Sequence, residues 1–281
     1  MNHTSIDFRA FAPLEATREK LAERGAYAKH FRSFTSDGKS SSVQGHIELL
    51  DELGISQQVV TGAGAPLEEL AALVSESDRF IGIADISPSP CMDAVETVHQ
   101  ACDMGLRLIG LTPYREGLPA SDRQYYPVYG KCCELGLGVI IHASTQLSSN
   151  CPMNLGHPCH LDQVAIDFPQ LVIVASHGGW PWVGDMTSIA MRHANVFIEL
   201  SGQRTKYYGV QGSGWEVLLK YAQGPLKKKI VWGSTAPFFD LAAQFSELGE
   251  LGLSEDLYKA IVLETPIEIL KRCGSSPYNR L

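Results

Sequence analysis

Two histidines stand at the ends of successive apolar runs in the middle of the chain. His142 closes the run GVIIH at 138–142, and His177 follows the run VIVAS at 172–176. A lone histidine at the end of a strand is more often a packing residue, but two in succession favour a shared site. Neutral imidazoles that converge can transfer protons or hold a zinc-type ion. His142 and His177 are therefore candidate catalytic and metal-binding residues.

An arginine lies near the end of the first apolar run, IDFRAFAP at 6–13. Arg9 and Phe11 are two apart, so in a strand their side chains point to the same side. A guanidinium is cationic at neutral pH and can clamp a carboxylate or stabilise an oxyanion. Arg9 is therefore a catalytic candidate, and Phe11 is expected to pack beneath the ligand. The alternative is that Arg9 forms a salt bridge with Asp7 or Glu199.

Further polar and aromatic residues follow other apolar runs. Tyr114 and Arg115 could add hydrogen bonds or charge for an anionic ligand, or form an ordinary surface pair. The segment SHGGWPWVGD at 176–185 places Trp180 after two glycines that let the backbone approach a ligand. Thr235, in GSTAP, can orient a ligand by a hydrogen bond but is a poor base. The ends of other apolar runs carry Asp85, Glu199 and Ser201.

A second cluster, CPMNLGHPCHLD at 151–162, contains cysteines and histidines within a few residues of each other. It looks like a structural zinc loop, but its spacing matches no common zinc pattern. Cys159 and His160 are adjacent, and this adjacency strains tetrahedral binding by both. We favour a loop over the mouth of the fold that offers His157 or His160 to the substrate.

The apolar runs that carry the candidates are apolar throughout, as in strands that are covered on both faces. Amphipathic helical patterns alternate with them, and several end in glycine, as at Gly54, Gly105 and Gly136. Eight strands, each followed by a helix, predict a parallel (β/α)8 barrel, the TIM barrel, whose chemistry lies at the C-terminal strand ends. The strands are expected at 5–10, 56–62, 79–86, 106–113, 137–144, 171–178, 195–202 and 229–236.

The segments between the strands also favour a barrel. An open doubly wound sheet is the alternative fold, but the glycine-rich phosphate loop typical of that fold does not follow the first strand. The length suits one barrel domain over 1–281, and residues 14–45 form a long first loop that is typical of a lid. Helices are expected at 46–54, 66–76, 92–105, 122–136, 160–169, 182–194 and 214–224, with extra helices after the last strand.

The composition narrows the classes of function. Hydrophobic residues make up 44% of the chain, enough for a large core, and the net charge of −8 would repel phosphate backbones, which argues against nucleic-acid partners. Seven cysteines without regular spacing indicate a reduced, cytoplasmic setting. We expect neither a signal peptide nor a membrane helix, because no apolar run approaches roughly 20 residues.

Four segments of the chain resemble, in order and spacing, the signature segments of the amidohydrolase superfamily. They are IDFRAFAP, VIIHAS, ASHGGWPW and VWGSTAPF. The chain is most similar to the amidohydrolase-2 group, which contains aminocarboxymuconate-semialdehyde decarboxylase-like enzymes and pyrone-dicarboxylate lactonase-like hydrolases. The resemblance covers nearly the whole chain and implies the barrel. Such barrels often self-associate, so a homo-oligomer is compatible with the sequence.

The resemblance also implies a ligand set that the chain keeps only in part. Members of the group typically carry His-x-His after the first strand, a histidine after the fifth and the sixth, and an aspartate after the eighth. His142 and His177 match the two single histidines, but Arg9 and Phe11 stand in place of His-x-His, and Thr235 in place of the aspartate. One divalent metal such as zinc is the cofactor that the group implies, held here by an incomplete set. We expect Arg9 to supply the positive charge instead.

Three hypotheses for the function follow. The first is hydrolysis of a small, carboxylated ester, lactone or amide, in which His142 and His177 transfer protons and Arg9 stabilises charge. The second is non-oxidative decarboxylation of an unsaturated or aromatic acid, which needs an electron sink and a proton donor. The third is a non-catalytic protein that binds a small acid on the same fold. In each case the expected partner is a small anionic molecule.

Overall fold

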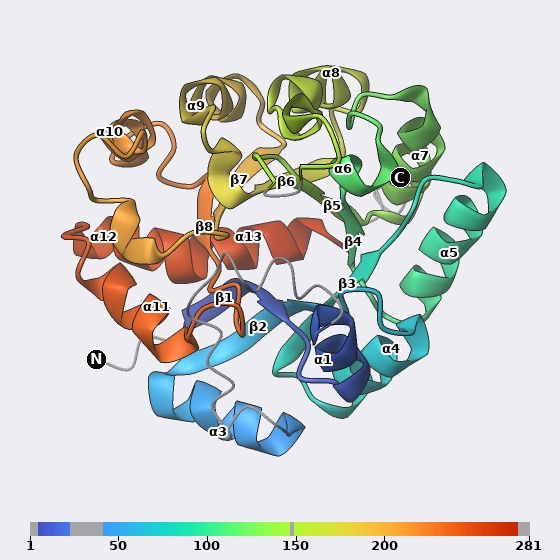
Figure 1. The fold of residues 1–281 in the computed structure, drawn as a ribbon, viewed down its shortest axis with the longest axis horizontal. Coiled ribbons are helices and arrows are strands. Elements are labelled where there is room, and N and C mark those ends of the chain that lie inside the picture. The colour runs from blue at the N-terminus through green and yellow to red at the C-terminus, as the bar shows by residue number, and fades with distance from the viewer. Residues whose placement is uncertain (1–4, 23–41, 147–148, 275–281) are drawn as a thin grey trace.

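The computed structural model describes residues 5–22, 42–146 and 149–274 of the chain. Eight strands form one parallel sheet in which each strand pairs with the next one along the chain. This is the TIM barrel that the sequence predicts, and Figure 1 shows its strands surrounded by helices. The strands are β1 (Ser5–Phe11), β2 (Ile55–Thr61), β3 (Phe80–Asp85), β4 (Leu108–Leu111), β5 (Gly138–His142), β6 (Val172–Ser176), β7 (Val196–Leu200) and β8 (Ile230–Trp232).

The first strand and the segment after the last strand close the barrel. The backbone N–H of Phe11 donates to the carbonyl of Ala236, and the N–H of Thr235 donates to the carbonyl of Arg9, both at 2.8 Å. Just before this point, the Asp7 carboxylate accepts hydrogen bonds from the backbone N–H of Ser234 at 2.8 Å and from its hydroxyl at 2.6 Å. The seam therefore joins the two ends of the barrel through backbone and side-chain bonds.

Helices cover the outside of the sheet, as the alternating pattern predicts. The apolar faces of these helices and the outward faces of the strands bury one continuous hydrophobic cluster. The helices are α1 (Glu15–Ala22), α3 (Val43–Leu53), α4 (Leu67–Glu76), α5 (Cys91–Asp103), α6 (Pro113–Glu116), α7 (Tyr126–Leu135), α8 (Cys159–Asp167), α9 (Val183–Arg192), α10 (Glu216–Ala222), α11 (Leu241–Gly249), α12 (Glu255–Lys259) and α13 (Thr265–Arg272).

The barrel interior is filled by a layer of apolar side chains. These residues and α13, through Ile269 and Cys273, form a second hydrophobic cluster. Side chains two residues after this apolar layer again point into the barrel, because successive residues of a strand alternate between its two faces. The chemistry-bearing layer therefore lies directly above a dry apolar floor. The floor is made by Phe8, Val59, Ile83, Leu108, Ile140, Val174, Phe197 and Val231.

Two expectations about the elements need correction. The strands β3 to β8 are shorter than predicted by up to several residues, because residues at their ends leave the ladder and enter loops, whereas β1 is one residue longer and β2 is shifted by one residue. The expected long first loop at 14–45 contains a helix, α1, whose Thr17 hydroxyl donates to the carbonyl of Gly62 at 3.1 Å. The remainder of that loop, 23–41, lies outside the described residues. The predicted helix ends at Gly54 and Gly136 are confirmed, since both adopt φ of 70°.

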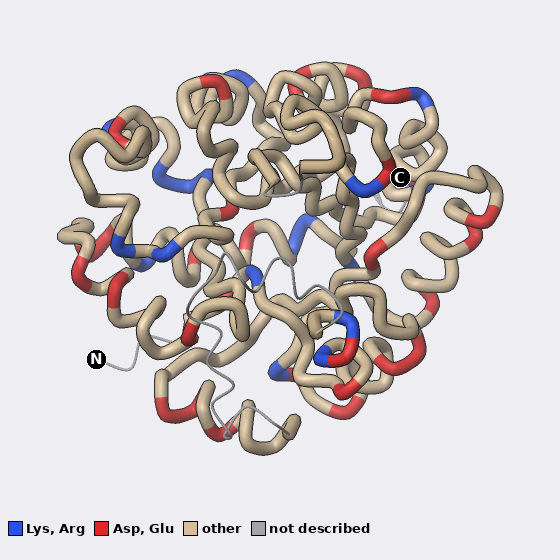
Figure 2. The backbone as a smooth tube through the Cα atoms, viewed as in Figure 1, with Lys and Arg blue, Asp and Glu red and all other residues tan. Residues whose placement is uncertain are grey.

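Charged residues lie mainly on the outer helices and in the loops, with acidic and basic positions interspersed (Figure 2). All seven cysteines are free thiols. In the described part of the chain, no helix combines the length and the apolar character that crossing a membrane requires.

Candidate active site

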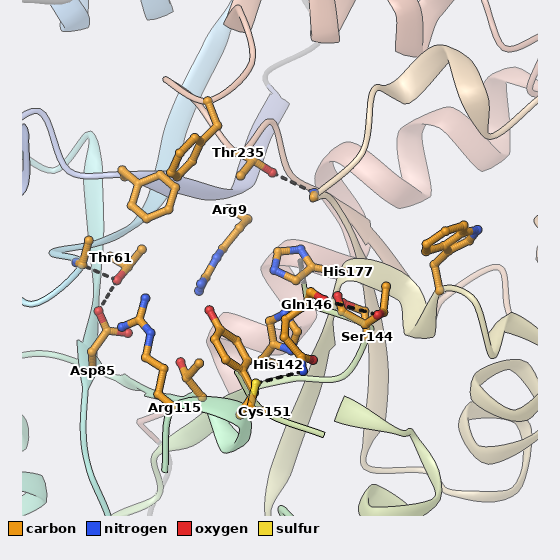
Figure 3. Close-up of a pocket in the computed structure, with 18 of the residues that line it drawn as sticks. Arg9, Thr61, Asp85, Arg115, His142, Ser144, Gln146, Cys151, His177 and Thr235 are labelled. Carbon is orange, nitrogen blue, oxygen red and sulfur yellow. Dashed lines mark hydrogen bonds between the residues drawn. The ribbon is translucent and has the colours of Figure 1, made fainter. Parts of the chain in front are cut away.

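A cavity of about 750 Å³ opens at the C-terminal ends of the strands. The eight residues predicted to act in catalysis or substrate binding line it, although they come from different strands and loops, and Figure 3 labels five of them, Arg9, Arg115, His142, His177 and Thr235. A parallel barrel brings the ends of all its strands to one face, which explains why residues distant in sequence meet here. The eight residues are Arg9, Phe11, Tyr114, Arg115, His142, His177, Trp180 and Thr235.

A register irregularity in β1 aims Arg9 at the cavity. The pairing of β1 with β2 shifts between Asp7 and Ala10. Phe8 belongs to the apolar floor, while the next residue, Arg9, lines the cavity. Consecutive residues of a regular strand face opposite sides, so a bulge is needed to bring both to the barrel axis. Phe11, two residues after Arg9, lines the cavity as the spacing predicts.

A glycine in β8's exit segment provides the space for the arginine. A Cβ built on Gly233 would stand 2.4 Å from Cβ of Arg9 and 2.7 Å from Oε1 of Glu199. The arginine stem and the Glu199 carboxylate therefore pack directly against the bare Cα of this residue. In the described residues the Arg9 guanidinium forms no ion pair with Asp7 or Glu199, so the salt bridge that the sequence left open is not found.

The two imidazoles form a close pair. Their ring centroids are 4.9 Å apart at an interplanar angle of 69°, and the edge of Tyr114 packs on His142 with centroids 4.8 Å apart. Burial lowers the pKa of His142 to about 3, and the positive charges of Arg9 and Arg115 add to this effect. Burial, His142 and Arg9 likewise hold the pKa of His177 well below its usual range. Both rings are therefore neutral at physiological pH.

A chain of hydrogen bonds supports His177. Its Nδ1 lies 2.8 Å from the Ser201 hydroxyl, and that hydroxyl donates to Oε2 of Glu199 at 2.9 Å. The backbone N–H of His177 donates to the same carboxylate oxygen at 3.4 Å. Burial raises the pKa of Glu199 to about 7, although Arg9 and the hydrogen bonds favour its charged form. The sequence placed Glu199 and Ser201 at a strand end, and the structure shows them behind His177.

His142 is held less tightly. Its Nε2 lies 3.5 Å from the Ser144 hydroxyl, and its buried Nδ1 has no hydrogen-bond partner among the described residues. In the view of Figure 3 the guanidinium groups of Arg9 and Arg115 point toward the middle of the cavity, with both imidazoles on the other side. The site therefore combines two cations with two neutral nitrogen bases.

Arg115 comes from the short helix α6 that follows β4. Its guanidinium carbon lies 6.0 Å from the centre of the Tyr114 ring, within reach of a cation–π contact. No carboxylate in the described ranges forms an ion pair with Arg115. Because an unpaired guanidinium in a cavity attracts anions, Arg115 and Arg9 together define an anion-binding region.

An aromatic wall faces these polar groups. Phe11 and Phe238 pack edge to face with ring centroids 5.0 Å apart, and Phe239 also lines the cavity. Trp180 also lines the cavity, and its indole N–H donates to the carbonyl of Ser213 at 3.3 Å. The wall offers apolar faces to a flat ligand, because aromatic rings pack well against other rings.

Two carboxylate residues line the cavity, Glu116 in α6, which accepts from the Ser87 hydroxyl, and Asp85 at the end of β3. The hydroxyl of Thr61 makes a short hydrogen bond to Oδ2 of Asp85, and the N–H of Ala63 donates to the same hydroxyl at 3.1 Å. A Cβ on Gly110 would stand 2.5 Å from Oδ1 of Asp85, so this glycine leaves room for the carboxylate. The sequence marked Asp85 as a strand-end residue but assigned it no role.

Backbone strain is concentrated at the cavity. His177 and Thr235 have φ of 68° and 58°, a region that residues with a Cβ seldom adopt. For a β-branched residue such as Thr235 this conformation costs of order 1–3 kcal/mol. Its hydroxyl accepts a hydrogen bond from the N–H of Gly202 at 2.8 Å, which ties the exits of β7 and β8 together. Strained residues that persist at a cavity point to a functional role.

The cysteine and histidine cluster at 151–162 does not act as expected. His157 contacts Asp185 at 3.4 Å, and His160 contacts the Ser121 hydroxyl and the Asn154 carbonyl, both at 3.2 Å. Neither imidazole lines the cavity, which corrects the expectation that one is offered to the substrate. Among the described residues, no group of three or more His, Cys, Asp and Glu could hold a metal ion, in this cluster or elsewhere.

Two residues from the loop after β5 line the cavity: Gln146, which sequence reasoning missed, and Cys151, which begins the cluster expected to lie over the mouth of the fold. The Gln146 side-chain N–H₂ donates to the Cys151 sulfur at 3.1 Å and to the Pro152 carbonyl at 3.2 Å, and both side chains line the cavity. Their positions depend on a loop conformation that no periodic pattern encodes. For Gln146 the only signal in the sequence was its place after a predicted strand.

The chain belongs to the amidohydrolase family. The family model described as amidohydrolase, of the amidohydrolase-2 group, matches residues 10–272. This confirms the resemblance found in the four signature segments. Among curated proteins the comparison finds no match to this chain.

Solved structures share the fold at low sequence identity. An uncharacterised TIM-barrel protein from Bordetella bronchiseptica has 22% identity and a TM-score of 0.83, covering 97% of this chain and 100% of its own. A 2,6-dihydroxybenzoate decarboxylase from Rhizobium has 15% identity and a TM-score of 0.71, covering 96% and 99%. A dihydroxybenzoic acid decarboxylase from Polaromonas, solved with bound manganese, has 15% identity and a TM-score of 0.69, covering 96% and 97%.

The described residues do not fit a divalent metal of the kind that the Polaromonas structure holds. Only His142 and His177 offer nitrogen ligands, whereas metal sites normally use three or four protein ligands. The nearby Arg9 and Arg115 already disfavour positive charge on His142, and the same charges disfavour a metal cation. Two imidazoles beside two guanidinium groups are therefore a poor fit for such a cation.

Proposed function

We propose that the protein is an enzyme that hydrolyses a small, carboxylated ester, lactone or amide at the mouth of the barrel. One observation carries the proposal: two guanidinium groups without ion pairs in the described chain share a cavity with two neutral imidazoles. Cations of this kind select an anionic substrate, and neutral imidazoles can accept protons from water.

The cavity suggests how a substrate is oriented. Arg115 binds a substrate carboxylate, and the aromatic wall of Phe11 and Phe238 packs against a flat ring or conjugated chain. Arg9, which the bulge in β1 aims inward, then lies beside the carbonyl that reacts. This arrangement favours small ring-shaped or unsaturated acids, whose charged and apolar parts match the two sides of the cavity.

The reaction follows from the groups present. A water molecule attacks the substrate carbonyl carbon, and Nε2 of His177 accepts a proton from that water. The carbonyl electrons move to oxygen, and the Arg9 guanidinium stabilises the resulting oxyanion. The carbonyl re-forms as the bond to the leaving oxygen or nitrogen breaks, and the imidazolium of His177 returns its proton to the leaving group. A substrate anion bound at Arg9 and Arg115 offsets the effect of their positive charges on the neighbouring imidazoles. The pKa of each imidazole then rises toward the range in which it can accept a proton from water.

Decarboxylation is the second candidate, and shared fold with two decarboxylases of dihydroxybenzoic acids favours it. Two features of the site favour hydrolysis instead. In decarboxylation, negative charge leaves the departing carboxylate in the transition state. A guanidinium bound to that carboxylate therefore stabilises the ground state more than the transition state, which slows the reaction. The two imidazoles are neutral, and decarboxylation needs a proton donor rather than a base.

The test is a product assay on the purified protein. Carboxylated lactones, esters and amides are compared with hydroxybenzoic acids, and proton release and carbon dioxide are measured separately. We expect proton release without carbon dioxide, and a fall of about 10²–10³-fold in kcat/KM in Arg9→Ala. Arg192→Ala, which removes an exposed arginine paired with Asp162, is the control and should match the wild type. Carbon dioxide release would support decarboxylation, and tight binding without turnover would support a binding protein.

A further inference from the structure

The hydrogen bonds behind His177 have one consistent direction when Glu199 is ionised. Oε2 of Glu199 accepts from the backbone N–H of His177 at 3.4 Å, and a backbone N–H can only donate. The same oxygen lies 2.9 Å from the Ser201 hydroxyl. When Glu199 is ionised, the form that Arg9 and these hydrogen bonds favour, both of its oxygens can only accept. Oε2 then accepts both bonds, and Ser201 must donate to it.

The direction of this first bond fixes the second. The single hydroxyl proton of Ser201 points to Glu199. The Ser201 oxygen can therefore offer only a lone pair to Nδ1 of His177, which lies 2.8 Å away. Only an Nδ1–H can complete that contact. The remaining ring nitrogen, Nε2, makes no hydrogen bond within the described residues and is not among the buried unpartnered atoms. It is therefore the nitrogen that meets the cavity, which His177 lines.

A half-turn of the ring would put Cδ2 in place of Nδ1 and lose the hydrogen bond to Ser201, and close packing holds the plane of the ring. A Cβ on Gly202 would stand 2.6 Å from Nδ1 and 2.8 Å from Cγ of His177, so the Cα of Gly202 lies flat against that edge. The ring of His142 packs edge to face at 4.9 Å on another side. The left-handed backbone of His177, with φ of 68°, sets the direction in which the ring leaves the strand.

We propose that Ser201 and Glu199 are positioning residues that hold His177 in the Nδ1–H tautomer, so that the lone pair of Nε2 faces the cavity. The pair acts through His177 and does not touch the substrate. Its use in catalysis rests on the proposed hydrolysis, which needs a base at that place. The tautomer itself is a property of the protein without substrate, so it can be tested independently of any reaction.

The experiment is NMR of protein labelled with ¹⁵N-histidine, in which the two ring nitrogens report separately whether each carries a proton. His177→Asn identifies the signals of this residue among the nine histidines. We expect the wild type to favour Nδ1–H by about tenfold or more, and Ser201→Ala to reduce the preference to about threefold or less, as loss of one buried hydrogen bond implies. Glu199→Gln should keep the preference, because its side-chain oxygen still accepts from Ser201.

Ser144→Ala is the matched control, since Ser144 stands beside the other imidazole at 3.5 Å from His142. It should leave the His177 signals unchanged. If Ser201→Ala does not fold, Ser201→Thr keeps the hydroxyl and should keep the tautomer. A wild-type His177 protonated at Nε2, or a Ser201→Ala protein with the wild-type tautomer, would overturn the proposal. With any substrate that is turned over, Ser201→Ala should lower kcat and leave KM unchanged.

Discussion

Replacing Gly233 by alanine should damage both the fold and the anion site, because this glycine lies between Arg9 and Glu199. The new Cβ would meet Cβ of Arg9 at 2.4 Å, whereas carbon atoms in contact stand about 3.5–4.0 Å apart. The Arg9 stem must therefore move by roughly 1 Å or more. Overpacking of this kind costs about 1–3 kcal/mol of stability, and a misplacement of about 1 Å can cost about 10²-fold in activity.

The assay has two parts. Urea unfolding measures the free energy of unfolding, and tryptophan fluorescence measures the dissociation constant of benzoate, a small aromatic anion. We expect Gly233→Ala to lose about 1–3 kcal/mol and to bind benzoate more weakly than the wild type. Gly130→Ala is the control: this glycine lies inside α7 with nothing within 4 Å of a new Cβ, and the change should stabilise by about 0.5–1 kcal/mol. Wild-type stability and wild-type benzoate binding in Gly233→Ala would refute the packing argument.

Two further predictions concern charge and metal. Glu199 has a pKa raised from 4.5 to about 7, so its contribution to stability is fully present below pH 4.5 and is lost as the pH rises through 7. Between pH 4.5 and pH 8 the free energy of unfolding of the wild type should therefore fall by about 3 kcal/mol relative to that of Glu199→Gln, as measured by urea unfolding. If both proteins show the same pH dependence, the raised pKa of a buried Glu199 is contradicted. Added Mn²⁺ should leave the thermal midpoint unchanged, because the cavity offers two imidazoles beside two arginines; a rise that a chelator reverses would contradict this reading of the ligands.

The barrel could be predicted from the sequence because its strands are short apolar runs between amphipathic helices. All eight expected strands are present, and the two histidines stand where the pattern placed them. The helix α1 was missed because its residues Glu15–Ala22 have a weak amphipathic pattern and follow a proline-containing turn. The four-residue helix α6 is too short for any periodicity to show.

The site was predicted in part for the same reason. Strand ends meet at one face, so Arg9, His142 and His177 could be expected together. The roles of Gln146 and Cys151 depend on the path of a loop, and local periodicity carries no information about that path. The bulge that turns Arg9 inward and the close approach at Gly233 depend on contacts between the first and last strands, which sequence pattern alone does not reveal.

The seam between β1 and the exit of β8 means that the cavity is complete only when both ends of the chain are in place. Asp7 and Ser234 are 227 residues apart, and closing so long a loop is a cost that slows folding. An incompletely synthesised or partly folded chain would lack the wall that Arg9 and Thr235 build. A ligand held between these two residues would in turn fasten the first strand to the last, so its binding should raise resistance to heat and to proteases throughout the barrel.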